Sequence, residues 1–276
     1  MSLPSYRQPP TPADAGPPAG RVDPALADRL TDALLLAGLP VAFGDHGPGV
    51  RIRPARPVDD GDRCAGVAAL DWLPSPRLTD AAAMAEPGQS AGPAREAVET
   101  AMTNALAEFL PAFGLETTRD RTGGELRVDG RGAVDGGLRV PPGALVARQP
   151  GPVPAEPGLP AGLVGTVRRS AALAGLPLAV RPGAAGITLA PGAPTGGADD
   201  RDGAADLGWN PSRRLADLAD SALPEAARAT AARTAVDGAM RHALGMALRA
   251  CGTELRWLHA HQLLRAYGES TPTIRR

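Results

Sequence analysis

The chain contains an internal repeat, which limits the folds that it can adopt more than any other feature of its sequence. Residues 72–80 (WLPSPRLTD) recur as residues 209–217 (WNPSRRLAD), 137 positions later. With an offset of 138, residues 97–106 fall on residues 235–244. The positions that match are mostly apolar, as in the shared core of repeated structural units. We therefore predict a tandem duplication of one module.

Each copy is predicted to begin with a helix followed by a β-hairpin. In the first copy, Asp23 suits the N-cap, Pro24 suits the first helical position, and apolar residues recur at helical spacing until Gly38. Residues 40–43 and 50–53 then alternate apolar and polar side chains on either side of a glycine-rich turn, which is typical of a hairpin. The second copy shows the same order.

A third strand is predicted to end at the repeated tryptophan. Ala68, Leu70 and Trp72 share one face of this strand, while the opposite face carries Asp71 in the first copy and Asp206 in the second. We therefore expect one face of the sheet to meet solvent or a partner.

A short helical turn and a long helix complete the module. The long helix has apolar side chains at helical spacing in both copies. These residues are Ala97, Val98, Ala101, Met102, Ala105, Leu106, Phe109 and Leu110, and Ala235, Val236, Ala239, Met240, Ala243, Leu244, Ala247 and Leu248. The predicted fold class is α+β, a tandem duplication of a helix–three-strand antiparallel sheet–helix module packed as an intramolecular pseudo-dimer. This order of elements is similar to that of small α+β secretion chaperones and related bacterial modules, with which the chain shares no motif.

The repeat divides the chain into five predicted segments. They are a disordered Pro/Ala/Gly-rich tail (1–21), the first repeat (22–118), a partly structured linker (119–160), the second repeat (161–268) and a C-terminal tail (269–276). Within the linker, residues 125–128 and 137–140 are predicted strands. Residues 253–267 are predicted to form an extra helix that ends at Gly268.

Composition and charge argue against several classes of protein. The formal net charge of −1 provides no overall field that would attract nucleic acid or anionic lipid. The chain contains arginine but no lysine, which is typical of a protein from a high-GC bacterial genome. Cys64 and Cys251 do not correspond between the copies, so we expect no disulfide framework and a reducing cytoplasm. The sequence predicts neither a membrane span of about 20 apolar residues nor a signal peptide.

The repeated segment offers one candidate ligand site. Ser75 and Ser212 occupy predicted N-cap positions of the short helices, and Arg77 and Arg214 fall in their first turns. Free backbone N–H groups, the serine hydroxyl and the arginine would together bind a phosphate or a carboxylate. The alternative, which we favour, is structural: each arginine pairs with the aspartate three residues later and lies over the tryptophan ring.

No metal, cofactor or catalytic motif is predicted. His259 and His261 would point in opposite directions on a helix and have no third ligand nearby. His46 is interpreted as a turn residue, and His242 as part of the polar face of the long helix. The sequence contains no glycine-rich phosphate loop after a strand, no G-x-S-x-G and no H-E-x-x-H. A non-catalytic protein without a cofactor is therefore favoured.

Three functions are compatible with these patterns. The first is a non-catalytic cytoplasmic protein-interaction or regulatory protein built from two homologous modules. The second is a small anionic-ligand-binding protein or enzyme with a site at the repeat interface, and the third is nucleic-acid binding through an Arg-rich face of the second repeat. The copies differ along the second long helix and the C-terminal segment, so the predicted partner surface comprises Arg241, His242, Trp257 and Tyr267.

Overall fold

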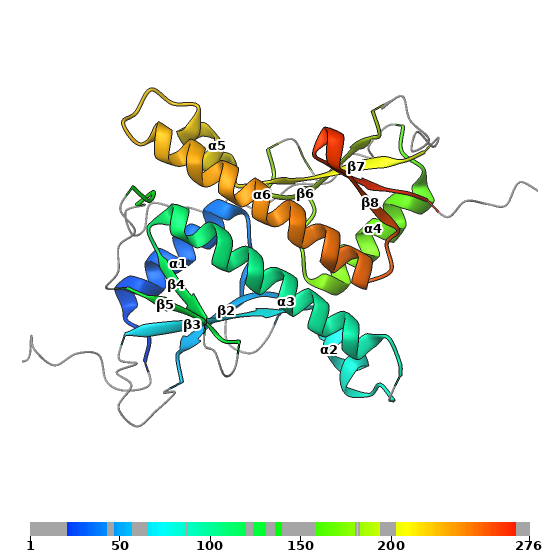
Figure 1. The fold of residues 1–276 in the computed structure, drawn as a ribbon, viewed down its shortest axis with the longest axis horizontal. Helices are drawn as coiled ribbons and strands as arrows, with labels where there is room; N and C mark the ends of the chain where they lie inside the picture. Colours follow the sequence, from blue (N-terminus) through cyan, green and yellow to red (C-terminus); the bar gives the residue numbers. More distant parts are fainter. Residues whose placement is uncertain are drawn as a thin grey trace, which may run out of the picture.

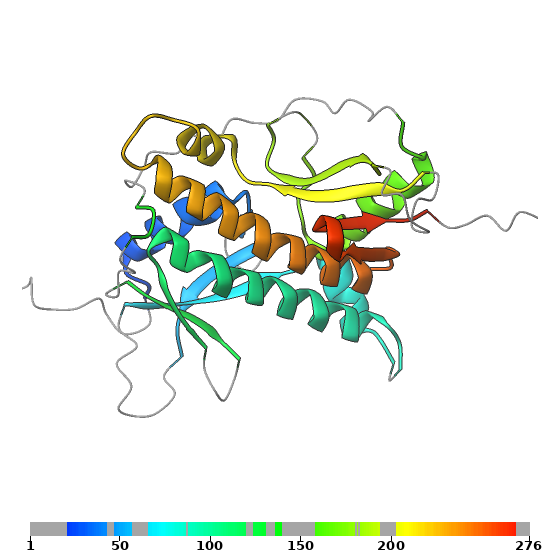
Figure 2. The same ribbon diagram turned by 45° about the horizontal axis from the view of Figure 1, so that its top comes forward.

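The computed structural model describes residues 21–42, 47–56, 66–86, 88–119, 124–130, 136–139, 158–179, 181, 183–193 and 203–268. Within them the chain has a mixed α+β fold, with six α-helices and two β-sheets of five and four strands. The two long helices, α3 (Ala91–Phe109) and α6 (Ala226–Ala250), lie side by side and antiparallel, with one sheet on either side of the pair (Figures 1 and 2). The α+β class predicted from the sequence is confirmed.

Helix α1 (Pro24–Ala37) begins and ends where the sequence predicts. The Asp23 carboxylate accepts a hydrogen bond of 2.8 Å from Ala25 N, and Gly38 ends the helix with a φ of 84°. Helix α4 (Ala161–Ala174) ends in the same way at Gly175, with a φ of 77°. Because glycine adopts this left-handed conformation without steric cost, the two glycines define both helix ends.

The first sheet has the strand order β1-β2-β3-β5-β4. Its strands are β1 (Val41–Ala42), β2 (Gly49–Pro54), β3 (Val67–Leu73), β4 (Glu116–Arg119) and β5 (Leu126–Asp129). The predicted inward face of β3 is buried, since Ala68, Leu70 and Trp72 are at most 1 % exposed. The opposite face carries Asp71, as expected, together with the charged residues described below.

The antiparallel hairpin predicted at the start of this sheet is wrong. β1 pairs with β2 in parallel, with Val41 opposite Val50, and Val50 N donates a 2.9 Å hydrogen bond to Pro40 O. Gly49 makes this close approach possible, because its φ is 135° and a Cβ there would lie 2.6 Å from the same carbonyl oxygen. Alternation of side chains identified two strands, but it does not specify their relative direction.

The second sheet has the strand order β6-β7-β9-β8. Its strands are β6 (Gly186–Pro191), β7 (Ala205–Asn210), β8 (Leu255–Leu258) and β9 (Leu263–Ala266). Leu178 adds a parallel bridge to Ile187 on β6, as β1 does to β2 in the first sheet.

The extra helix predicted for residues 253–267 is wrong. This segment forms the hairpin of β8 and β9, closed by the short 3-10 turn η3 (His259–His261). Tyr267 N donates to Glu254 O at 3.1 Å and extends the pairing. The helical interpretation relied on apolar content, whereas pairing of β9 with β7 buries alternate residues and satisfies the backbone.

An equivalent hairpin, β4 and β5, adds two strands to the three predicted for the first sheet. β5 matches the strand predicted for residues 125–128 to within one residue, and it pairs directly with β3. The sheet therefore continues to Asp129, beyond the predicted end of the first repeat at residue 118.

The second strand predicted in the linker, residues 137–140, does not form within the part that the structure describes. Residues 136–139 have no strand assignment. Leu138 is nevertheless 1 % exposed, and its N–H donates to Ala112 O at 2.8 Å. The segment thus packs against the end of α3 instead of joining a sheet.

Hydrogen bonds between the first half of the described chain (α1 to β5) and the second half (α4 to β9) occur in reciprocal pairs. The donors belong to the segments that lead into α2 (Pro76–Ala83) and α5 (Arg213–Ala219), and the acceptors are carbonyls in the last turns of α4 and α1. The bonds are Trp72 Nε1 to Ala174 O and Trp209 Nε1 to Ala37 O, both 2.8 Å, and Ser75 N to Leu173 O (3.1 Å) and Ser212 N to Leu36 O (2.9 Å). Last-turn carbonyls have no partner within their own helix, so each half caps a helix of the other.

One buried apolar cluster extends through both halves and includes Trp72, Met102, Trp209 and Met240. Among the residues described, no helix is both long and apolar enough to cross a membrane. The predicted tails, except Arg21, lie outside the described residues, as do His46 and Cys64.

Candidate functional site

A network of ion pairs lies on the face of the first sheet opposite its buried face. Arg53 on β2 is at its centre. Its Nε and Nη2 atoms lie 2.6 Å and 3.1 Å from the two carboxylate oxygens of Asp71 on β3. Its Nη1 atom lies 2.6 Å from Glu125 Oε1, just before β5. One guanidinium group therefore holds two carboxylates, using the planar fork of donors that arginine provides.

Two more arginines extend this network. Arg51 Nη2 lies 3.0 Å from Asp71 Oδ2, and Arg127 Nε lies 3.1 Å from Glu125 Oε2. The Glu125 and Arg127 side chains are 9 % and 12 % exposed, and that of Asp71 is 26 % exposed. Among the described residues, Arg51, Arg53 and Arg127 thus share the carboxylates of Asp71 and Glu125.

The arginines keep Asp71 ionised. Burial of the carboxylate opposes ionisation, but hydrogen bonds and attraction from Arg53 and Arg51 outweigh it, so the pKa of Asp71 lies below its ordinary value. Hydrogen bonding to Asp71 in turn raises the pKa of Arg53. A carboxylate with a lowered pKa is a poor proton acceptor at neutral pH. The network is therefore suited to holding charge, not to transferring protons.

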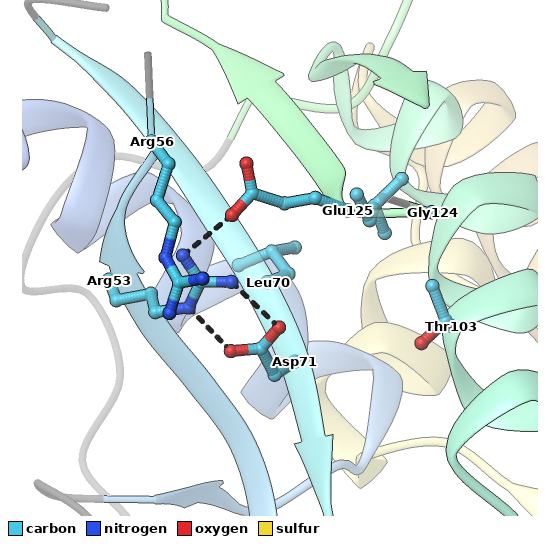
Figure 3. Close-up of a pocket in the computed structure, with 8 residues that line it drawn as sticks. Arg53, Arg56, Leu70, Asp71, Thr103, Gly124 and Glu125 are labelled. Carbon is cyan, nitrogen blue, oxygen red and sulfur yellow. Dashed lines mark hydrogen bonds and ion pairs between the residues drawn. The ribbon is translucent and has the colours of Figure 1, made fainter. Parts of the chain in front are cut away.

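A cavity of about 280 Å³ opens beside the network (Figure 3). Charged residues of the network line it together with Leu70 and Leu126, which are themselves at most 1 % exposed. The lining residues are Arg53, Arg56, Leu70, Asp71, Thr103, Gly124, Glu125 and Leu126. Thr103 projects from α3 on the side opposite the two arginines (Figure 3). This volume is near the lower end of the range for small-molecule sites.

Unequal strand lengths create the cavity. β2 pairs with β3 as far as Leu73, whereas β5 pairs with β3 only from Val67 to Leu70. Next to Asp71, the described part of the sheet therefore has no strand on the β5 side. Thr103 of α3 and the turn at Gly124 border the space instead.

The corresponding place in the second half is filled. With an offset of 138, Arg241 takes the position of Thr103, and Gln262 takes that of Gly124. Arg241 Nη1 donates to Gln262 O at 2.8 Å, and its Nη2 atom pairs with Asp237. Gly124 and Gln262 both have a positive φ, 65° and 52°, so the backbone has a similar left-handed conformation at these two positions. The Arg241 side chain thus lies where the first half has the smaller Thr103.

Two other features of the described structure bear on its chemistry. Burial raises the pKa of the Cys251 thiol to about 11, so this thiol is protonated at neutral pH and unreactive. Within the described ranges, His, Cys, Asp and Glu side chains form no group of three or more that could hold a metal ion.

The structure confirms the predicted serine caps but not the predicted arginine pairs. The hydroxyls of Ser75 and Ser212 each accept a 3.3 Å hydrogen bond from the N–H three residues later, so they serve as helix caps. Arg77 and Arg214 are exposed, and among the described residues neither is ion-paired with the aspartate three residues later. Arg213 pairs with that aspartate in the second copy instead, at 3.5 Å. An anion site at these residues stays a prediction.

The four residues predicted for a partner surface lie in different settings. Arg241 is tied to α6 and to the β8–β9 turn, and His242 is exposed on α6. Trp257 is half-buried, with its ring edge-on to His259 at a centroid distance of 6.1 Å. Tyr267 is 4 % exposed and belongs to the interior. His259 and His261 are both exposed in the η3 turn.

The network and the cavity were not predicted, because the predicted first repeat (22–118) does not include β5, whose pairing with β3 brings Glu125 and Arg127 close to Arg53. Residues 126–127 (LR) match residues 264–265 (LR) at the offset of 138, and Gly130 matches Gly268. This match covers β5 and β9, which pair with β3 and β7 at corresponding places in the two sheets.

Comparisons with protein-family models, with curated proteins and with solved structures found no match. The function is therefore inferred from the geometry of the site.

Proposed function

We propose that this chain is a non-catalytic protein-interaction or regulatory protein of the cytoplasm, built by tandem duplication of one module. Its two modules, residues 22–130 and 161–268, form an intramolecular pseudo-dimer. The first module carries the recognition site, and the second module serves mainly to complete and stabilise the pair.

Reciprocal contacts support the pseudo-dimer. In a twofold-related interface, each contact occurs twice with the roles of the two partners exchanged. The tryptophan and serine hydrogen bonds between the halves have this property. In the same way α1 contacts α5 while α4 contacts α2, and α3 lies antiparallel to α6 (Figure 1).

The observation that carries the binding role is the contrast between an open, charged cavity in the first half and a filled place in the second. The arginines of this network hold the Asp71 carboxylate ionised and pair with Glu125, which suits recognition of a charged group. Because desolvation opposes the attraction, ion pairs as buried as these are weak evidence for a role in stability. Charges fixed on a rigid sheet do, however, increase association rates and select among partners.

Affinity capture tests this proposal. The tagged full-length protein, exposed to lysate of its native cytoplasm, is expected to retain a stoichiometric protein partner. The Arg56→Glu variant reverses a charge at the cavity and should lose that partner. The matched control is Arg213→Glu, because Arg213 is 79 % exposed in the second half and should not affect capture. Absence of a protein partner, or equal retention by all three proteins, would overturn the proposal.

A small anionic-ligand-binding protein is the second candidate, and the cavity itself favours it. Retention of an anionic metabolite without any protein in the same capture experiment would support this alternative.

A further inference from the structure

We propose that the contact between α2 and α4 binds a phosphoryl group between Arg77 and Arg169, either as inorganic phosphate or as a small phosphate monoester. Neither arginine lines the first-half cavity, so this site goes beyond the proposed recognition site and does not depend on a protein partner. In the proposed pseudo-dimer, the counterpart of this contact is the one between α1 and α5.

The two contacts have the same register. In each, the serine before the short helix donates its N–H to a last-turn carbonyl, which is Leu36 O (2.9 Å) on α1 or Leu173 O (3.1 Å) on α4. Asp32 on α1 and Arg169 on α4 each lie four residues, about one helical turn, before that carbonyl. They therefore occupy the same position relative to the start of the short helix, α5 or α2.

The α1–α5 contact contains its own acidic groups. Asp32 is 7 % exposed. Burial and the nearby Asp28 raise the pKa of Asp32, and the charge of Arg214 on α5 opposes this shift, so Arg214 and Asp32 are close enough to interact. Arg214 thus faces two acidic side chains of the same chain.

The α2–α4 contact has arginine on both sides instead. Arg77 and Arg169 stand at the positions of Arg214 and Asp32, and α4 carries no acidic residue. Both arginines are exposed, and within the described ranges neither is ion-paired. Arg169 Nη2 donates to the uncharged Thr166 Oγ1 at 3.2 Å. Two like charges in register repel each other, and an anion between them would replace this repulsion with attraction.

A phosphoryl group suits this pair of cations. It carries about two negative charges at pH 7 and about three acceptor oxygens, and the planar forks of two arginines match such oxygens. Asp80, three residues after Arg77, is the acidic group that could compete, but it is exposed and is not ion-paired with Arg77 among the described residues. Because solvent and salt screen exposed charges, we expect weak binding that low ionic strength favours.

Titration of the full-length protein with inorganic phosphate and with glycerol 3-phosphate, followed by backbone NMR shifts at low ionic strength, tests the inference. We expect a Kd of about 1–10 mM, with shifts centred on Arg77 and Arg169. Arg77→Gln and Arg169→Gln should each weaken binding by about 5–10-fold, because charge-assisted hydrogen bonds are lost. Arg169→Asp copies the arrangement of Asp32 and should abolish binding.

Two matched variants separate this site from general charge. Arg214→Gln removes the equivalent arginine of the second half and should leave phosphate binding unchanged. Asp80→Asn removes the competing carboxylate and should tighten binding by about 2-fold. All the substituted residues are exposed, so the variants should fold, and thermal unfolding without phosphate checks this.

The two probes also distinguish the sources of the phosphoryl group. Tighter binding of glycerol 3-phosphate identifies a phosphate monoester, and tighter binding of phosphate identifies the free anion; both outcomes support the inference. Undetectable binding of both probes at about 50 mM, or equal weakening by Arg77→Gln and Arg214→Gln, overturns it. None of these substitutions alters the first-half cavity, so such a failure would leave the affinity-capture test of the proposed function unaffected.

Discussion

The paired strands β3 and β5 in the first half, and β7 and β9 in the second, place charged residues at equivalent positions with different results. Arg127 and Arg265 occupy the same register position of their hairpins. The Arg265 side chain is 1 % exposed, with Nε and Nη2 lying 2.7 Å and 3.1 Å from the two carboxylate oxygens of Asp206. Arg127 instead shares Glu125 with Arg53, beside an open cavity. The same strand pairing thus supports a closed ion pair in one half and an open network in the other.

The closed pair is also tied to the backbone on both sides. Arg265 Nη2 donates to Ala193 O at 2.6 Å, and Ala193 N donates to Asp206 Oδ2 at 3.0 Å. Removal of one partner from such a pair leaves the other charge buried in a low dielectric. In the first half each carboxylate is shared between two arginines, so the loss of one leaves the other in place. The closed ion pair holds its part of the sheet rigid. In the open network, a carboxylate or an arginine can give up one contact to a ligand and keep the other.

The largest expected effect comes from comparing Arg265→Ala with Arg127→Ala. Arg265→Ala should lower the free energy of unfolding by about 3–5 kcal/mol, because Asp206 would remain as an uncompensated buried charge. Arg127→Ala should cost about 1–2 kcal/mol, because Arg53 still pairs with Glu125. Urea unfolding of both variants at pH 7 measures the difference. Equal losses would show that the two halves do not differ in this respect.

Replacement of the two tryptophans tests whether the halves are equivalent where they meet. Trp72→Phe and Trp209→Phe each remove the Nε1 donor to a buried last-turn carbonyl, Ala174 O or Ala37 O. Each should lower stability by about 1–3 kcal/mol, and the two values should agree to within about 0.5 kcal/mol. A larger difference between the two losses of stability, measured by thermal or urea unfolding, would contradict the proposed pseudo-twofold relationship. Agreement would show that the two halves are equivalent where they meet, in contrast to the charged sites.

The sequence predicted the parts of the fold that depend on local signals. Asp23, Gly38 and the buried face of β3 were identified correctly, because capping and side-chain alternation act within a few residues. The direction of β1 and the hairpins after the long helices were not, since these depend on pairing with β2, β3 and β7 across the sheet. Alternation also placed Asp71 on the open face. Its partner Arg53 lies 18 positions away in the sequence, and Glu125, the other carboxylate that pairs with Arg53, lies 54 positions away, so only the folded sheet brings them together.

The smallest expected effect concerns the contacts of α1 with α5 and of α4 with α2. Asp32 on α1 is 7 % exposed, and its Oδ2 atom is buried without a hydrogen-bond partner among the described residues. Burial, reinforced by Asp28 on the same helix, raises the pKa of Asp32, and only Arg214 of α5 opposes this shift. The equivalent position on α4 is Arg169, which is exposed. The two contacts therefore differ in their response to pH.

A carboxyl group with a raised pKa binds its proton more tightly in the folded than in the unfolded state. Its contribution to stability is therefore fully present below the unfolded pKa of about 4, and is lost as the pH rises through the folded value. Asp32→Asn should accordingly stabilise the protein by about 0.5–1 kcal/mol at pH 7, and this advantage should disappear near pH 4. Arg169→Gln should show no such dependence in matched urea titrations. If Asp32→Asn is destabilising at pH 7, attraction to Arg214 outweighs burial, and Asp32 stabilises the contact of the two halves as an ion.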